Sequence, residues 1–551
     1  MNEKHHEQGS GNSDSEVIVR LDTALFNAGV VGLVNILERG GIQHQINRDQ
    51  LTISKADLIK ADLAALYVEA IIDRYKETTR LYTSMSKMNS ILDMKKVDDP
   101  KQFKENIKYI VGSFVQQSVL TGFEVLKADG IENNIAENIS KLKEDTFENL
   151  EATKSLIREI YNDFEKEEIQ KTLYMKNIMY TKINMIWSGI AFLHKNQVKF
   201  NITKVLNDRL IDSIREMLIS GKKQKKRCCV CDIECDNLQS LSFIQNLGID
   251  DGKKKSPFWN YKPDLSACPL CTFIYTCAPL GFNSIDQDLI FINENETIDG
   301  LINANSKREF DNIENKSRFS VITQLILKEM AEKKRELNNI EVLINQKLSN
   351  DKTRYSLNVV DKRLIKIFTD CKIELNSISK NKVNIGNSSK PEWISVLETV
   401  LDCLFYNKAL YNTIHKFLKY GAYANTLMQM LMIEIKRKKK EEEKVQNNIK
   451  RAWAVWNNGQ EVKNRFNDGS KNENKLNGIV IKLQNAVRSE NRELFFDILI
   501  RLYSGINMPI PSGFLNGIES DDDFKEIGLA FILGLLGEPR KEKEDKEGKG
   551  E

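Results

Sequence analysis

Four cysteines in two C-x-x-C pairs are the residues of this sequence whose spacing is most typical of a defined chemistry. Cys228 and Cys231 form the first pair, and Cys268 and Cys271 form the second. A C-x-x-C turn directs two thiolates toward one point, and two such turns supply the tetrahedral sulfur shell that Zn²⁺ accepts at about 2.3 Å per bond. The spacing therefore predicts one zinc site. Because four sulfurs leave no open coordination position, the predicted zinc is structural and not catalytic.

Two disulfides, or a set of buried free thiols, are the alternatives to a metal site. Apart from Cys371 and Cys403, all cysteines of the chain lie between residues 228 and 277. A secreted protein of this length would distribute its disulfides, whereas a single cluster in a chain without a signal peptide favours a reducing compartment and a metal. We therefore prefer the zinc interpretation.

Three further cysteines in the cluster, Cys229, Cys235 and Cys277, are surplus to a four-ligand site. The pair of Cys231 and Cys235 could replace the first C-x-x-C pair, so the sequence alone leaves the identity of the first pair open. The segment between the two pairs is longer than the roughly 15 to 20 residues of a compact zinc ribbon. We expect the two pairs to hold the ends of an inserted loop together.

The N-terminal elements are expected to form a mixed α/β body. Val17–Leu21 has a β-type composition, Thr23–Glu38 has helical periodicity and is followed by Gly-Gly, and alternating apolar residues around residues 47–50 predict a β-hairpin. Gly29 and Gly32 within the helix cost about 1 kcal/mol each against Ala. They indicate close approach of another backbone or a partner, or simply tight packing.

The rest of the chain is predominantly helical in pattern. Helical periodicity begins at Ser54, a predicted N-cap, and returns over 321–346; residues 289–292 resemble a buried strand, and the polar stretch 293–317 is expected to be rich in loops. We expect an α+β fold, predominantly helical, with an inserted zinc-ribbon-like module and an all-helical C-terminal bundle. The expected divisions are a disordered tail at 1–15, a body at 16–220, the cysteine insertion at 221–282, a continuation with a linker at 283–390, the bundle at 391–539, and a disordered tail at 540–551.

Composition limits the functional classes. The formal net charge is +3, so the molecule as a whole is not basic and any nucleic-acid contact must come from local patches. No apolar run approaches the roughly 18 residues that a membrane helix needs, and the expected location is the cytoplasm.

Two basic segments border and interrupt the cysteine module. Residues 221–227 contain four lysines and Arg227, and Lys253–Lys262 combines lysines with Trp259 and Tyr261. Lysines can hold phosphates while aromatic rings stack on bases. A solvated charged surface is the competing explanation for both segments.

The sequence lacks the common catalytic templates. The phosphate-binding G-x-x-x-x-G-K-[ST] loop and H-E-x-x-H are absent. A zinc deaminase needs H-x-E followed by P-C-x-x-C, but His5-His6-Glu7 lies in the expected tail and Pro269 lies inside its C-x-x-C pair. We therefore expect a protein that is not an enzyme.

The succession of motifs along the chain resembles the large subunit of type I-B CRISPR effector complexes, the Cas-eight or Cst family. The resemblance covers nearly all of the expected ordered chain and rests on the order of the motifs, which apart from the cysteine pairs are individually weak. They are Phe26–Leu33, Cys268–Cys271, Pro279–Phe282, Phe291–Asn293, Asn485–Arg488 and Ala530–Leu535.

The resemblance implies a subunit of Cascade, the assembly in which a CRISPR RNA pairs with invading DNA. Such a subunit binds near the 5′ handle of the RNA, recognises the protospacer-adjacent motif in double-stranded DNA, helps to open the duplex, and recruits the helicase-nuclease; other Cascade subunits are its partners. Base pairing recognises the target itself. The helical C-terminal block resembles the small subunit, which an internal start at Met428, Met430 or Met432 could produce separately.

Residues for nucleic-acid contact cannot be transferred from the family one by one. Arg488, Arg492 and Arg501 stand at helical spacings of four and nine and could line a basic face. Our candidates come from the basic segments, the motifs and this face, with Asn27 assigned to the neighbourhood of the RNA handle or of the subunit that caps it: Lys253, Lys254, Lys255, Trp259, Asn260, Tyr261, Asn27, Arg488 and Arg492. Two functions from other classes compete with this one. They are a zinc-ribbon adaptor that binds proteins, and a metal-dependent nuclease.

Overall fold

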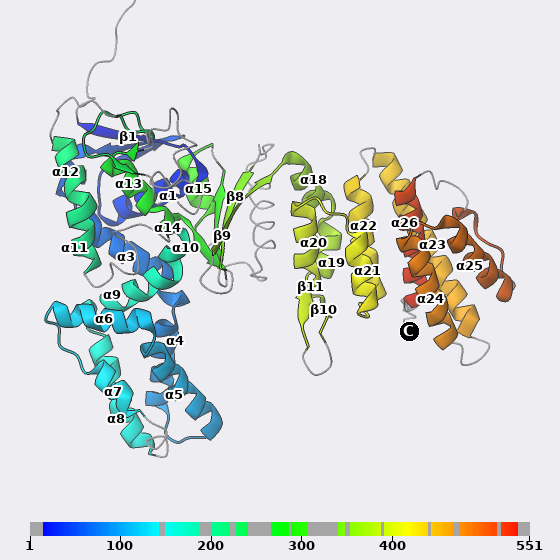
Figure 1. The fold of residues 1–551 in the computed structure, drawn as a ribbon, viewed down its shortest axis with the longest axis horizontal. Coiled ribbons are helices and arrows are strands. Elements are labelled where there is room, and N and C mark those ends of the chain that lie inside the picture. The colour runs from blue at the N-terminus through cyan, green and yellow to red at the C-terminus, as the bar shows by residue number, and fades with distance from the viewer. Residues whose placement is uncertain are drawn as a thin grey trace, which may run out of the picture. The chain divides into compact units, whose positions relative to one another are not determined.

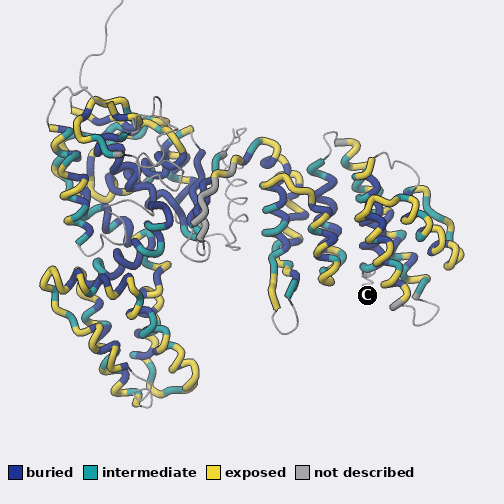
Figure 2. The backbone as a smooth tube through the Cα atoms, in the orientation of Figure 1, coloured by how far each residue is buried: buried dark blue, intermediate teal, exposed yellow. Residues whose placement is uncertain are grey.

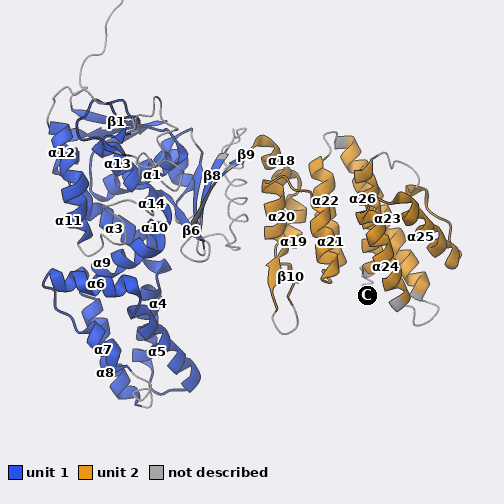
Figure 3. Cartoon of the chain, viewed as in Figure 1, with its two compact units in different colours: residues 1–316, 339–359 blue, residues 317–338, 360–551 orange. Residues whose placement is uncertain are grey.

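The computed structural model describes most of the 551-residue chain. The described residues are 15–142, 149–187, 201–219, 227–240, 266–285, 288–294, 296–306, 340–347, 353–386, 391–438, 442–467, 473–514 and 520–537. They form two compact units, and unit 1 contains the described residues up to Val359 while unit 2 contains those from Val360 onward (Figure 3). No helix among them is both long and apolar enough to cross a membrane.

Unit 1 combines small antiparallel sheets with many helices (Figure 1). Its strands are β1 (Glu16–Arg20), β2 (His44–Asn47), β3 (Gln50–Ser54), β4 (Gln239–Ser240), β5 (Ser266–Ala267), β6 (Asn283–Ile285), β7 (Asp288–Asn293), β8 (Ile340–Lys347) and β9 (Thr353–Val360). Its helices are α1 (Ala24–Arg39), α2 (Lys55–Lys60), α3 (Leu63–Tyr75), α4 (Arg80–Asp93), α5 (Pro100–Phe114), α6 (Gln117–Ala128), α7 (Ile135–Lys141), α8 (Leu150–Phe164), α9 (Glu167–Ile178), α10 (Asn184–Ile186), α11 (Ile202–Leu206), α12 (Asp212–Ile219), α13 (Pro269–Thr276), α14 (Ala278–Gly281) and α15 (Ile298–Ala304).

The predicted N-terminal elements are confirmed. β1 and β2 pair with opposite edges of β3, and the second sheet has the order β6-β7-β8-β9. Gly41, just after α1, has a φ of +59°, as expected for the residue that follows a helix. The Ser54 hydroxyl accepts the N–H of Asp57 and so caps α2. Helix α1 lies in the buried interior of the unit (Figure 2).

Two predictions for the middle of the chain were wrong in part. Residues 340–346 belong to strand β8 and not to a helix, because Val342, Leu343 and Ile344 complete the buried sheet against β7. A short, wholly apolar run does not distinguish a buried strand from a buried helix. The stretch expected to be rich in loops contains α15, which begins where the Thr297 hydroxyl accepts the N–H of Gly300.

Unit 2 is almost entirely helical. It contains α18 (Lys362–Asp370), α19 (Lys372–Ile378), the strand pair β10 (Lys382–Asn384) and β11 (Trp393–Ser395), α20 (Val396–Phe405), α21 (Tyr411–Lys419), α22 (Ala424–Lys438), α23 (Glu442–Asn467), α24 (Glu473–Arg488), α25 (Arg492–Gly505) and α26 (Asp521–Leu536). It begins about thirty residues before the expected division at 390, because α18 and α19 pack against α22. The expected fold class, mostly helical α+β, is confirmed.

Candidate metal centre

Two short segments of unit 1 bring the four predicted sulfurs together. The first knuckle, Cys228–Cys235, is a turn closed by the antiparallel bridge between Arg227 and Glu234. Within it the Cys228 N–H donates to the carbonyl oxygen of Ile233 at 2.9 Å, and Asp232 adopts a left-handed φ of 58°. Ion pairs from Arg227 to Asp232 and Glu234, at 2.8 and 3.1 Å, brace the turn from its exposed side.

The second knuckle, Cys268–Cys271, is the start of a helix. Cys268 is the N-cap of α13, and its Sγ accepts the N–H of Cys271 at 3.4 Å. Pro269 occupies the first helical position, where its missing N–H costs nothing. Helix N-termini favour negative charge, so this position suits thiolates.

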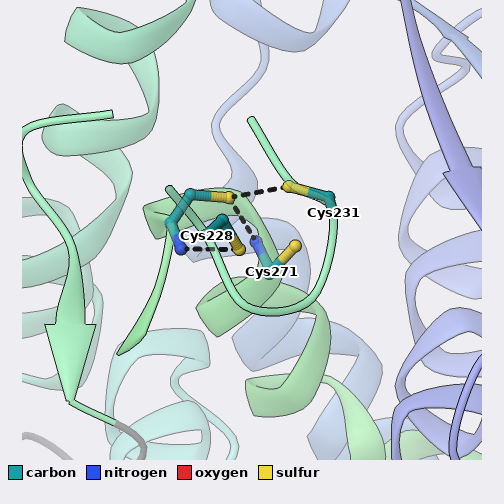
Figure 4. A group of neighbouring side chains, drawn as sticks. Cys228, Cys231 and Cys271 are labelled. Atoms are coloured by element: carbon teal, nitrogen blue, oxygen red, sulfur yellow. Dashed lines mark hydrogen bonds between the residues drawn. The ribbon is translucent and has the colours of Figure 1, made fainter. Parts of the chain in front are cut away.

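The four sulfur atoms fit a tetrahedral metal site. The Sγ atoms of Cys228, Cys231, Cys268 and Cys271 all lie within 4.8 Å of one another, and those of Cys231 and Cys268 are 3.7 Å apart. Zinc–sulfur bonds of about 2.3 Å require tetrahedron edges of about 3.8 Å. The labelled side chains converge on one small region (Figure 4). The cluster can hold a metal ion, and its all-sulfur donor set is consistent with zinc.

Backbone groups already organise the first ligand. The Cys228 Sγ accepts the N–H groups of Val230 and Cys268, at 3.4 and 3.2 Å. The second of these bonds crosses between the knuckles, as does the bond from the Cys229 N–H to the carbonyl oxygen of Ser266 at 2.9 Å. Such bonds orient metal ligands, and no side-chain pattern in the sequence could have identified them.

Hydrogen bonds among the four thiols shift their pKa values in different directions. Hydrogen bonds from the thiols of Cys231, Cys268 and Cys271 hold the pKa of Cys228 below its ordinary value. Hydrogen bonding to Cys228, followed by burial, raises the pKa of Cys268 and Cys271. The cluster therefore favours a thiolate on the first knuckle, where the pKa of Cys231 is also lowered. Metal binding would displace the protons of the remaining thiols.

The structure also decides among the surplus cysteines. Cys235 and Cys277 are buried and Cys229 is exposed, and none of their sulfurs joins the four-sulfur cluster. The first pair is therefore Cys228 with Cys231, and the alternative pair of Cys231 with Cys235 is not formed.

The second knuckle is fixed to the core by direct backbone contact with α1. A Cβ atom on Gly29 would lie 2.1 Å from the carbonyl oxygen of Ile274, and one on Gly32 would lie 2.2 Å from that of Cys277. Gly281 makes the reciprocal approach to the carbonyl oxygen of Ala28, at 2.3 Å. These contacts explain why Gly29 and Gly32 occur within the N-terminal helix despite their low helix propensity. Without a Cβ they allow α13, which contains Cys271, and the following helix α14 to pack directly against the backbone of α1.

The remaining predicted site residues are not brought to the cluster. Asn27 is fully buried, and its side chain accepts the Asp22 N–H at 2.8 Å and donates to the Asn293 Oδ1 at 3.0 Å. Its placement is thus in the core of unit 1 and not on a surface that could contact RNA. The six candidates between 253 and 261, together with residues 220–226, lie outside the described residues.

The two predicted arginines of unit 2 differ in their surroundings. Arg492 forms an ion pair with Asp521 at 2.7 Å and lies over the ring of Phe524. Arg488 is exposed and lines a groove beside α21. Arg501, on the same predicted basic face, pairs with Asp497 at 3.0 Å. The continuous basic face expected from helical spacing is therefore reduced to Arg488.

Comparison with known proteins gives one match. The family model described as "CRISPR-associated protein (Cas_CXXC_CXXC)" matches residues 221–283, which include both knuckles. Neither the search of curated proteins nor the search of solved structures finds a match. The matched segment supports a CRISPR-associated protein, and such a protein acts together with other CRISPR-associated proteins and nucleic acid.

Proposed function

We propose that this CRISPR-associated protein is the non-catalytic large subunit of a type I-B effector complex. The observation that carries the proposal is the match of residues 221–283 to a CRISPR-associated family defined by two C-x-x-C pairs, in a chain whose other motifs follow the order of the Cas-eight family. In this role the subunit binds the 5′ handle end of the CRISPR RNA and recognises the protospacer-adjacent motif in duplex DNA. It aids R-loop formation and recruits the helicase-nuclease, while base pairing recognises the target.

A metal at the cluster would support this role by holding together the described residues that border segment 241–265, which itself lies outside the described residues. Ser240 and Ser266, which border the loop, are paired in the β4–β5 ladder. Ser266 accepts the N–H of Cys229, and Cys268 follows two residues later in the chain. The described residues on both sides of the segment that contains Lys253–Lys262 are therefore joined to each other beside the sulfur cluster. A zinc ion there would restrict where those lysines and aromatic residues can reach.

The experiment replaces Lys253, Lys254 and Lys255 by Ala in the assembled complex. Loss of three phosphate contacts should weaken binding of motif-bearing duplex and reduce the slope of log K against log salt by up to about 2.7. The matched control removes Lys101, Lys104 and Lys108 from α5, which changes net charge equally at another surface of unit 1. Wild-type affinity and salt slope in the loop variant would refute this assignment.

Two other outcomes would favour the competing functions. If substitution of the knuckle cysteines prevents assembly of the complex but leaves DNA binding unchanged, the result would indicate a zinc-ribbon adaptor. Cleavage of DNA by the purified chain with Mg²⁺ or Mn²⁺ would indicate a nuclease; the proposal predicts none.

The internal start is a further part of the proposal. Met428, Met430 and Met432 are buried in α22, so in the full chain they are core residues. A product that begins there would lack α19 and α21, which pack against α22. Changing the three to Leu should abolish the small product while conserving core volume; an undiminished product on a gel would exclude this origin.

A further inference from the structure

A groove on unit 2 lies between α21 and α24, beside the end of α26. Its volume is about 920 Å³, which is in the range that binds small or segmental ligands. The helices that form it are labelled in Figure 1. Its lining includes His415, Lys416, Lys419, Tyr420, Ile481 and Arg488.

The groove has cationic groups and lacks carboxylates among its described lining residues. Lys416, Lys419 and Arg488 are exposed, and none of them forms an ion pair in the part of the chain that the structure describes. In a chain with 81 basic and 78 acidic residues, most surfaces mix both signs. Arg492 and Arg501 of α25 illustrate this, since each forms an ion pair with an aspartate. The groove therefore presents unneutralised positive charge.

His415 provides an independent indication of a ligand. Its side chain is only 8% exposed, it lines the groove, and its Nδ1 has no hydrogen-bond partner. Its carbonyl oxygen accepts the Gln484 Nε2–H at 3.3 Å, which ties the two helices together. Burial, and then the positive charges of Arg488 and Lys525, lower the pKa of His415 to about 4. A buried polar nitrogen without a partner normally costs free energy. In the neutral tautomer with the hydrogen on Nδ1, this N–H could donate to an anionic ligand, which would also relieve the positive field.

The other lining groups suit bases and sugars. Tyr420 and Ile481 are 40% and 58% exposed, so they offer an aromatic and an aliphatic surface on which bases can stack. Asn412, Asn477 and Asn485 add uncharged donors and acceptors. An acidic peptide would use the cations but would not need the stacking surface.

We propose that this groove binds an unpaired nucleic-acid strand through its phosphodiester backbone, with Lys416, Lys419 and Arg488 as phosphate contacts and Tyr420 as a stacking surface. The proposal rests on the proposed function only for the source of the strand, since an RNA-guided complex contains unpaired RNA and displaced DNA. It assigns to unit 2 a contact separate from the motif-reading loop of unit 1.

The test measures binding of fluorescent single-stranded DNA, single-stranded RNA and duplex DNA to the full chain across a salt series. Replacing Lys416, Lys419 and Arg488 by Ala should weaken strand binding at least about tenfold and reduce the salt slope by about 2. The matched control replaces Lys372, Lys380 and Lys382, three exposed lysines of unit 2 outside the groove, and should retain binding. The variant Y420A should weaken binding, and Y420F should not.

The same binding measurements include the results that would overturn the proposal. The DNA and RNA probes show which strand is preferred. Equal losses in the groove and control variants would overturn the proposal, and so would poly-glutamate binding as tightly as the strand with the same residue dependence. Strand binding that is lost only with the Lys253–Lys255 substitutions would also overturn it. Motif recognition by the complex tests the proposed function separately, because the groove variant should still recognise motif-bearing duplex.

Discussion

Both units contain helices whose backbones touch through glycine, but among the described residues only those of unit 1 carry candidate metal ligands. In unit 1, Gly29 and Gly32 of α1 face α13 and α14. In unit 2, a Cβ on Gly534 of α26 would lie 2.2 Å from the carbonyl oxygen of Trp456, and one on Gly459 of α23 would lie 2.7 Å from that of Phe531. The unit 2 pair stabilises a bundle, whereas the unit 1 pair also positions half of a metal site.

The two knuckles of unit 1 differ in how far their local structure would depend on a bound metal. The second knuckle belongs to the core, where Cys268 and Cys271 are at most 2% exposed. The first knuckle is a turn with an exposed ion-pair network, although Cys228 and Cys235 are buried. Hydrogen bonds from the Cys268 N–H to the Cys228 Sγ and from the Cys229 N–H to the Ser266 carbonyl oxygen connect it to the segment that carries the second knuckle. Packing through α13 can maintain the second knuckle, whereas a bound metal would add the link that fixes the first knuckle to it.

The largest effect is expected when the metal ligands are removed, because the two knuckles should then differ most in local stability. We expect the combined substitution of Ser for Cys228, Cys231, Cys268 and Cys271 to abolish hydrogen-exchange protection over residues 227–240, because structural zinc supplies folding free energy. Helix α14, sheet β1–β3 and all of unit 2 should stay protected. Persistent protection of residues 227–240 would show that the first knuckle folds without metal.

Substitution of the contact glycines should weaken each unit separately. G32A should destabilise unit 1 by up to about 3 kcal/mol, since a Cβ there collides with backbone, even though Ala favours a helix by about 1 kcal/mol. G534A should have the same effect on unit 2. Urea unfolding with hydrogen-exchange readout of each unit would measure both.

Two glycines in open surroundings are the controls for this experiment. Gly112 in α5 has only the Arg80 side chain nearby, at 3.7 Å, and Gly478 in α24 has nothing within 4 Å. G112A and G478A should therefore stabilise their units by about 1 kcal/mol. Equal behaviour of contact and control variants would mean that the close approaches do not matter.

Acid should weaken unit 2 through His415. Its pKa is about 4 in the fold and about 6.5 in an unfolded chain. The unfolded state therefore binds a proton first as pH falls, and the stabilisation present above about pH 6.5 is lost progressively toward pH 4, by at most about 3 kcal/mol.

The variant H415Q should remove this part of the pH dependence. Urea equilibration at pH 7 and pH 5, followed by exchange labelling of α21 and α24 at one fixed pH, would measure it. H44Q, in the hairpin of unit 1, is the control. A pH dependence in H415Q identical to that of the wild type would exclude His415 as the source.

The smallest effect is expected for Cys229. Its side chain is exposed and outside the sulfur cluster. C229S should leave metal content and protection of the knuckles unchanged. A loss of metal in this variant would mean that Cys229 exchanges with one of the four ligands.

The sequence predicted which four cysteines cluster, because the C-x-x-C spacing within each pair is a local property. It also indicated the contact at Gly29 and Gly32, but not the partner, since Ile274 and Cys277 are distant along the chain. The strand β8 was missed because burial on both faces removes the alternation that marks a strand. The groove was missed because its lining comes from two helices, α21 and α24, that are far apart in the sequence. That its described lining residues include no carboxylate is visible only in the folded structure.

The most direct test of the metal centre is native mass spectrometry of the purified full chain. The account predicts one zinc ion per chain in the wild type and in C229S, and none in the variant with Ser at Cys228, Cys231, Cys268 and Cys271. A wild-type chain that is folded in both units without bound metal, or a variant that retains zinc, would contradict it.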